Sequence, residues 1–243
     1  MTPLIIVLGP VGSGRAGLVQ ELVGNAWPAA RSVRVLRAPT EASADHPPAD
    51  RWELRDGAAV LPAPGTEDVA ILVTDGRRSA VDQMEALHRT LFGSAQWRVQ
   101  RILTVLDCPL AHRHEAVAEW YGAAVHFADA VVLTRRWEVP GQWLGKYLAT
   151  FTDAFYPCLF VNLLKNGTLP NPAAAVEGEP LRMSHIFDDI DAVDEMEFDE
   201  DNLPDEPFDL VRQPDKYFAR DELGRRVLNV PEMGEILRRE QRS

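Results

Sequence analysis

Cysteine and lysine are scarce in this chain of 243 residues. Its two cysteines, Cys108 and Cys158, are too few for the disulfide framework of a small secreted protein. No apolar run approaches the roughly 18 residues that a membrane-spanning helix needs. The apolar stretch Leu4–Leu8 lacks the basic residues and the small-residue cleavage site of a signal peptide. We therefore expect a reduced, soluble, cytoplasmic protein that has no membrane partner.

Basic residues are scattered: the chain has 22 arginines and only 3 lysines, with no basic stripe. Nucleic acid is therefore not expected as a partner. Acidic residues, by contrast, are concentrated. Residues 187–209 contain 12 Asp or Glu and no Lys or Arg, which accounts for the whole net charge of −12. Apolar residues lie among these charges and indicate a segment that docks, either on a protein partner or on arginines of the body itself.

Short apolar runs rich in Val, Ile and Leu recur along the first 170 residues. They do not alternate with polar residues, which is typical of strands buried on both faces of a parallel sheet. The expected strands are residues 4–8, 33–36, 69–73, 102–106, 130–133 and 158–164. The expected helices are residues 14–23, 80–92, 111–121 and 143–154. This alternation predicts an α/β fold with a doubly wound, mainly parallel sheet and helices on both faces.

Two regions depart from this alternation. Residues 38–65 contain five prolines and predict a loop or insertion with one short strand near 52–54. After Pro170, a Pro/Asn/Ala stretch leads into the acidic segment, and residues 216–230 predict a β-hairpin before a terminal helix from Glu232. We therefore divide the chain into a domain of residues 1–170 and an appendage of residues 171–243, made of acidic linker, hairpin and helix.

The most informative motif lies where the first expected strand meets the first helix. Gly9 and Gly14 have the spacing of G-x-x-x-x-G-K-[ST], the P-loop whose backbone N–H groups bind phosphate at a helix N-terminus. This motif predicts a fold of the P-loop NTPase type, although a glycine-rich turn without a ligand would also fit. The residues expected to bind a nucleotide are Gly9, Gly12, Ser13, Gly14, Arg15 and Ala16.

Two of these residues depart from the motif. Arg15 stands where a lysine reaches the β and γ phosphates, and Ala16 stands where a hydroxyl holds Mg²⁺. Arginine keeps the positive charge without the compact geometry of an ammonium group. Alanine has no metal ligand, so the motif argues against Mg²⁺ and no metal site is expected.

Further segments follow the P-loop in an order that resembles one family, the CobW-like P-loop GTPases related to the HypB and UreG nickel-insertion GTPases. Residues 52–61 resemble the family's metal-motif region, and residues 71–76 resemble its third-strand element. Residues 103–107 are similar to its V-V-D strand and residues 127–137 to its guanine motif. The resemblance covers about residues 3–166 and implies a GTP-binding protein that acts in metal trafficking.

The positions that carry chemistry in that family are altered here. Val73 stands at the Mg²⁺-linked glutamate, Trp137 at the guanine-reading aspartate, and apolar residues at the metal-binding cysteines, positions 58, 60 and 61. Hydrolysis by the family's mechanism needs Mg²⁺ to neutralise charge on the phosphates. We therefore expect a degenerate member, a pseudoenzyme with a binding or regulatory role, which binds GTP or another nucleotide weakly and hydrolyses it weakly or not at all.

Two other functions remain possible besides that of a degenerate GTPase-like protein. One is an active GTP-binding metallochaperone that uses Arg15 and Asp75 in metal cofactor insertion, and the other is a structural subunit of an assembly.

The other candidate sites each have two interpretations. Cys108 and His112 have the spacing of a soft-metal site, unless Cys108 packs as a small apolar residue. Arginines that follow strand ends either form one anion-binding rim or are separate surface residues; these are Arg15, Arg77, Arg78, Arg135 and Arg136. The sequence leaves the oligomeric state open.

Overall fold

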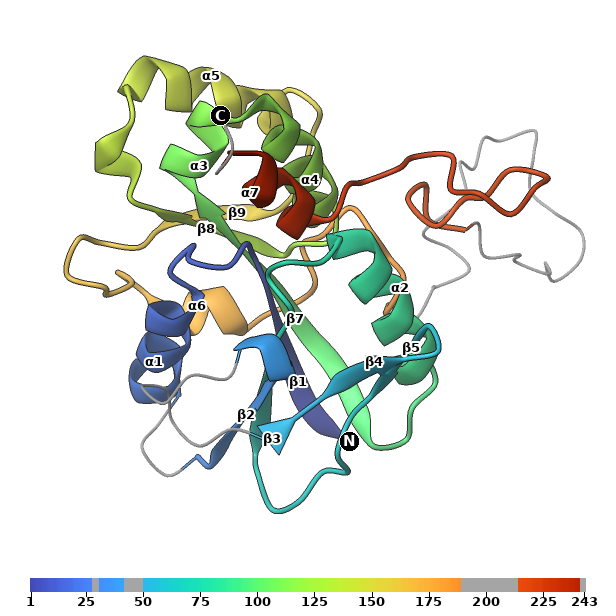
Figure 1. Cartoon of the computed structure of the whole chain (residues 1–243). Coiled ribbons are helices and arrows are strands. Elements are labelled where there is room, and N and C mark those ends of the chain that lie inside the picture. Colours follow the sequence, from blue (N-terminus) through green and yellow to red (C-terminus); the bar gives the residue numbers. More distant parts are fainter. Residues whose placement is uncertain (28–30, 42–49, 189–213, 241–243) are drawn as a thin grey trace, which may run out of the picture.

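A computed structural model of the chain describes residues 1–27, 31–41, 50–188 and 214–240. Within these ranges the centre is a seven-stranded sheet in the order β3-β2-β6-β1-β7-β8-β9 (Figure 1). Every neighbouring pair in this sheet is parallel. The strands are β1 Thr2–Leu8, β2 Val33–Arg37, β3 Asp50–Arg51, β6 Val69–Val73, β7 Trp97–Asp107, β8 Ala130–Thr134 and β9 Leu159–Asn162. All six strands expected from the sequence are confirmed.

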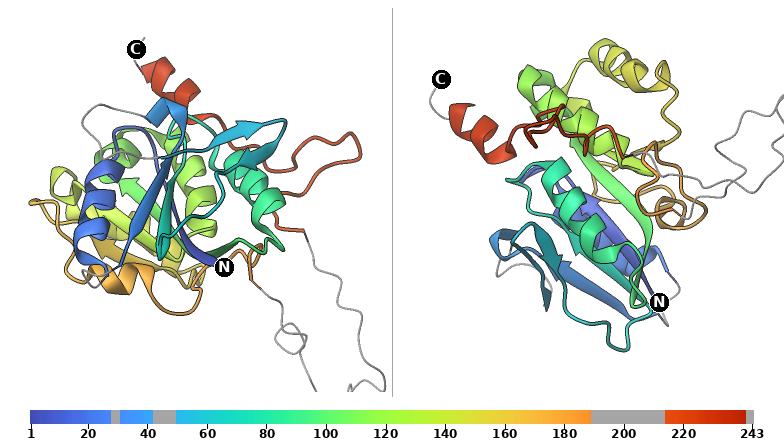
Figure 2. Two further views of the ribbon diagram at one scale, coloured as in Figure 1. Left: turned by 90° about the horizontal axis from the view of Figure 1, so that it is seen from below. Right: turned by 90° about the vertical axis from the view of Figure 1, so that its right-hand side faces the viewer.

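Helices cover both faces of the sheet, as expected (Figure 2). One face packs on α1 Arg15–Asn25 and α6 Pro172–Val176. The other face packs on α2 Ala80–Leu91, α3 Cys108–Arg113, α4 Glu115–His126, α5 Gly141–Thr152 and α7 Met233–Glu240. Alternate residues of β1 serve the two cores: Ile5 and Val7 face α1, and Leu4 and Ile6 face α2. The non-alternating pattern in the sequence follows from this burial on both sides.

The expected helix 111–121 is wrong in its bounds, because two helices meet there. His114 is extended, with φ −133° and ψ 107°, and separates α3 from α4. The first of these helices begins early because the Asp107 side chain accepts the Leu110 N–H at 3.3 Å, with Pro109 in the first turn.

The single strand expected near 52–54 is instead part of an antiparallel hairpin, β4 Glu53–Arg55 and β5 Ala58–Val60. Asp56 and Gly57 form its turn with φ values of 50° and 76°, the sequence and backbone of a tight type I′ hairpin. A 3₁₀ turn, η1 Pro39–Glu41, precedes this hairpin in the chain.

The hairpin expected at residues 216–230 is wrong in extent. In the described part of the chain it consists of one antiparallel bridge, between Arg220 and Arg226, around a turn at Asp221–Gly224. The two bridged arginines direct their side chains to α2, and the segment after them leads to the terminal helix α7, which is confirmed. The acidic segment lies outside the described residues, apart from Phe187 and Asp188.

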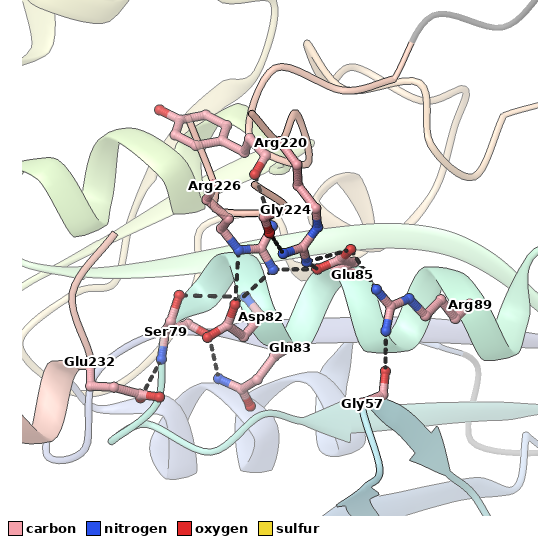
Figure 3. A network of polar contacts seen from close by, with 11 residues as sticks. Gly57, Ser79, Asp82, Gln83, Glu85, Arg89, Arg220, Gly224, Arg226 and Glu232 are labelled. Atoms are coloured by element: carbon pink, nitrogen blue, oxygen red, sulfur yellow. Dashed lines mark hydrogen bonds and ion pairs between the residues drawn. The ribbon is translucent and has the colours of Figure 1, made fainter. Parts of the chain in front are cut away.

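We call the contact between this turn and α2 the C-terminal clamp, formed by Arg220 and Arg226 with Asp82 and Glu85 (Figure 3). Arg226 Nη2 lies 2.7 Å from Asp82 Oδ1 and also binds Glu85, while Arg220 Nη2 lies 2.9 Å from Glu85 Oε2. Burial disfavours the charged form of Glu85, but the effect of its arginine partners is larger and holds its pKa below the ordinary value. The clamp fixes the C-terminal segment to the body.

A second anchor joins Ser184, which precedes the acidic segment, to Asp215, which follows it. Ser184 Oγ donates to Asp215 Oδ2 at 2.5 Å, and His126 Nε2 lies 2.8 Å from the same oxygen. Burial raises the pKa of Asp215, but the hydrogen bonds from His126 and Ser184 outweigh it and lower the pKa. The chain therefore leaves the body and returns to it at nearly the same place. None of the helices in the described ranges has the length and apolar character needed to cross a bilayer.

Candidate phosphate-loop site

The loop between β1 and α1 lies at the carboxyl edge of the parallel sheet, the edge where α/β sheets bind ligands. Three of its glycines have φ values that favour glycine: Gly9 at 150°, Gly12 at 80° and Gly14 at 96°. A Cβ on Gly9 would lie 3.0 Å from both the Ser13 hydroxyl and the Val105 carbonyl oxygen. The glycines are therefore required by a tight loop that wraps the start of α1.

The strand arrangement around this loop decides the fold class. The loop follows the central strand β1, whose neighbours β6 and β7 both run parallel to it, and the crossover helix α2 connects these two neighbours. A glycine loop that leads from such a strand into a helix is the phosphate-binding element of one large group of proteins. This chain has a P-loop NTPase fold.

Two solved structures illustrate what the chain is similar to. The hydrogenase maturation factor HypB from Archaeoglobus fulgidus matches with a TM-score of 0.41 and 12% identity over 69% of this chain and 83% of that protein. The Zn(II)-bound GTPase YjiA from E. coli matches with a TM-score of 0.45 and 13% identity over 74% of this chain and 66% of that protein. No protein-family profile and no curated protein sequence matches the chain. The fold assignment rests on the strand order and the glycine loop and not on these matches.

Arg15, the first residue of α1, is buried and bound within the chain. Its Nη1 donates to the Thr74 carbonyl oxygen at 2.5 Å, and its Nη2 lies 2.8 Å from Oε2 of Glu41. The other oxygen of Glu41 accepts the backbone N–H of Gly76 at 2.8 Å. The charge that would meet a phosphate in this P-loop is therefore neutralised by a carboxylate of the same protein.

The segment after β6 closes against the loop. The Val11 N–H, a candidate phosphate donor, donates instead to the Gly76 carbonyl oxygen at 3.0 Å. On the opposite side, Thr134 Oγ1 donates to the Ser13 carbonyl oxygen at 2.9 Å and so joins the loop to β8. These two contacts hold the loop in its bent form, and the first of them occupies one backbone N–H that could otherwise donate to an anion.

Two further groups at this edge have no hydrogen-bond partner among the described residues. Arg37 is 4% exposed, yet its Nε and Nη2 are unpartnered, and so is the buried hydroxyl of Ser13. Burial and the nearby charge of Arg15 lower the pKa of Arg37, while Glu41 opposes them. Our reading of the sequence missed Arg37 and Glu41. The only signal for Arg37 was an arginine that directly follows the second apolar run of the sequence.

The residues at this edge do not fit a bound Mg²⁺. Ala16 and Val73 have no ligand atoms, and the Asp75 carboxylate accepts the Arg77 N–H at 2.9 Å and lies 3.7 Å from Arg78 Nε. Asp107 caps α3 and binds Arg135. Across the described ranges, no three His, Cys, Asp or Glu side chains are grouped as a metal site requires. The loop can bind an anion through arginine and backbone donors, but the described residues do not supply the carboxylates and hydroxyls that hold this cation.

The remaining sequence candidates are not brought together. Trp137, at the guanine-reading position, is exposed and offers no acceptor for the base. Of the five rim arginines, Arg15 and Arg135 have separate carboxylate partners, which favours separate residues over one anion-binding rim. Cys108 is fully buried, which raises its pKa to about 12, and the His112 ring packs on Trp143 at 4.7 Å. Cys108 therefore packs as a small apolar residue.

Proposed function

We propose that this chain is a degenerate P-loop GTPase-like protein, with a binding or regulatory role and weak or no nucleotide hydrolysis. The pairing of Arg15 with Glu41 inside the loop carries the proposal, because it engages the one cation that the motif places for phosphate. The pair is buried, with side-chain exposures of 4% and 12%. A nucleotide phosphate must compete with this carboxylate, so binding of GTP or another nucleotide is weak.

Loss of hydrolysis follows from the missing metal ligands. In phosphoryl transfer, Mg²⁺ neutralises charge that develops on the phosphate oxygens, and a hydroxyl after the P-loop cation holds the metal. Ala16 cannot do this, and Asp75 would first have to leave the Arg77 N–H. A protein that does not hydrolyse a nucleotide can still have a binding or regulatory role, which its surface and its binding partners then determine.

A protein partner on the acidic segment, residues 187–209, is the second part of the proposal. The support lies in the described residues on either side of it, because the Ser184–Asp215 and Arg182–Asp188 contacts hold both ends of the segment against the body. By sequence the segment has twelve carboxylates, of which Asp188 is paired with Arg182, and so high a negative charge favours a basic protein surface. Both cysteines are free and buried, which suits a reducing compartment, so we place the protein in the cytoplasm. A role in metal homeostasis rests on the family resemblance alone.

Calorimetric titration with GTP and with ATP, each with and without Mg²⁺, tests the proposal. We expect weak binding that Mg²⁺ does not strengthen, and we expect Arg15→Met to remove any binding that uses the loop. Micromolar binding that depends on Mg²⁺ would overturn the proposal. It would favour the alternative of an active GTP-binding metallochaperone, in which Asp75 rearranges to hold the metal.

A further inference from the structure

Arg37 faces the P-loop although it belongs to a different strand. It is the last residue of β2 and pairs with Val73 of β6, which in turn pairs with Val7 of β1, two residues before the loop. Paired residues in a sheet project from the same face. Val7 and Val73 pack with Leu18 of α1, so the Arg37 side chain lies on the α1 side, at the same edge of the sheet as the loop.

Two of the three guanidinium nitrogens of Arg37 are buried without a hydrogen-bond partner among the described residues. Buried charged groups are normally paired, because leaving one unpaired in a protein interior costs several kcal/mol. Among the described residues, neither Nε nor Nη2 of Arg37 has a partner, and the Ser13 hydroxyl beside Gly9 has none either. These unmet donors belong to the same edge as the backbone N–H groups of the loop. A ligand that accepts hydrogen bonds would satisfy the donors of Arg37 and Ser13.

The local charge indicates the sign of that acceptor. Arg15 and Arg37 contribute two guanidinium groups, and Glu41 is the only carboxylate that influences both of them among the described residues. The Glu41 carboxylate itself forms an ion pair with the Arg15 guanidinium and accepts the backbone N–H of Gly76. Phosphoryl oxygens take the same kinds of donor. Glu41 therefore occupies part of an anion position that retains excess positive charge.

We infer that this edge is a metal-free site for a phosphoryl group, in which Arg37 acts with Arg15 and the incoming anion displaces Glu41. The inference rests on the proposed function, since it names the ligand class of the same loop. Two arginines supply the charge that Mg²⁺ supplies in an active P-loop enzyme, and each can bind a phosphoryl group through two parallel N–H donors. The site then retains phosphate recognition without the chemistry of hydrolysis.

Thermal unfolding in EDTA with inorganic phosphate tests this inference, with sodium chloride at matched ionic strength as the baseline. Phosphate at low millimolar concentration is expected to raise the Tm of the wild type. Arg37→Met should abolish that rise, and without phosphate this variant should be at least as stable as the wild type, because it removes a buried charge whose Nε and Nη2 have no hydrogen-bond partner among the described residues. Arg55→Met, at a side chain that is 65% exposed, is the matched control and should keep the full response.

Glu41→Gln tests the displacement step separately. Removing the competing carboxylate should lower the dissociation constant for phosphate roughly tenfold, the order expected for one charge-assisted contact. The inference is overturned if phosphate does not raise the wild-type Tm, if Arg37→Met keeps the response, or if that variant is less stable than the wild type without phosphate. Unchanged affinity in Glu41→Gln overturns it as well. None of these results affects the proposed lack of hydrolysis, which fails only with Mg²⁺-dependent nucleotide turnover.

Discussion

Replacing Gly76 with alanine is the sharpest perturbation of the closed loop. A Cβ there would lie 2.8 Å from the Pro10 carbonyl carbon and closer still to the Val11 nitrogen and Arg15 Nη2. Two of these three atoms are backbone, so the loop must move. Such overpacking costs about 1–3 kcal/mol, and loss of the hydrogen bond from Val11 adds about 1 kcal/mol. A destabilisation of about 3 kcal/mol lowers the Tm of a protein of this size by about 6–12 °C.

A matched substitution nearby separates the steric effect from the general effect of adding a methyl group. Gly17 lies in the first turns of α1, and a Cβ there meets nothing within 4 Å. Gly17→Ala should therefore stabilise the protein by about 0.5–1 kcal/mol through helix propensity. Both variants are compared by thermal and urea unfolding. If Gly76→Ala is as stable as the wild type, the loop is not closed against residue 76 and the reasoning fails.

Three further predictions concern the anchors and the thiols. Arg226→Met should lower the free energy of unfolding in urea by about 1–2 kcal/mol, since Glu85 keeps two other arginine partners; no loss would mean that the clamp does not stabilise the fold. The pKa of Asp215 is lowered in the folded protein, so its contribution to the free energy of unfolding is present above pH 3.8 and disappears as the pH falls through the pKa of the folded state. Acid should therefore destabilise the wild type more steeply than Asp215→Asn. Equal slopes of stability against pH for the two proteins would contradict this. Burial raises the pKa of Cys108 to about 12 and that of Cys158 to about 11, so a thiol reagent at pH 8 should label neither in the native state and both after unfolding.

The sheet was predictable because each of the six predicted strands contains a short apolar run in which polar residues do not alternate with apolar ones. The Val69–Val73 strand shows this most clearly, since all five residues are buried. The helix break at His114 was not predictable in this way, because one extended residue interrupts an otherwise continuous pattern. The turn at Asp56–Gly57 was present in the sequence as a hairpin signal, and we undervalued it.

The candidate site was predictable only as far as its motif extends. Glycines and the position of Arg15 follow from local spacing, and the loop conformation agrees with them. The partners of Arg15 do not, because Glu41 and Thr74 reach it only when β2 and β6 are paired beside β1. Contacts of this kind depend on tertiary structure, and no local pattern encodes them.

Single-turnover hydrolysis tests the central claim most directly. The protein is held in excess over labelled GTP, with Mg²⁺ or with EDTA, and phosphate release is followed over time. We expect the rate to equal that of the protein-free blank in both conditions, because Ala16 and Val73 provide no metal ligand and Arg15 is bound to Glu41. A rate that rises with Mg²⁺ and is lost in Arg15→Met would contradict the account.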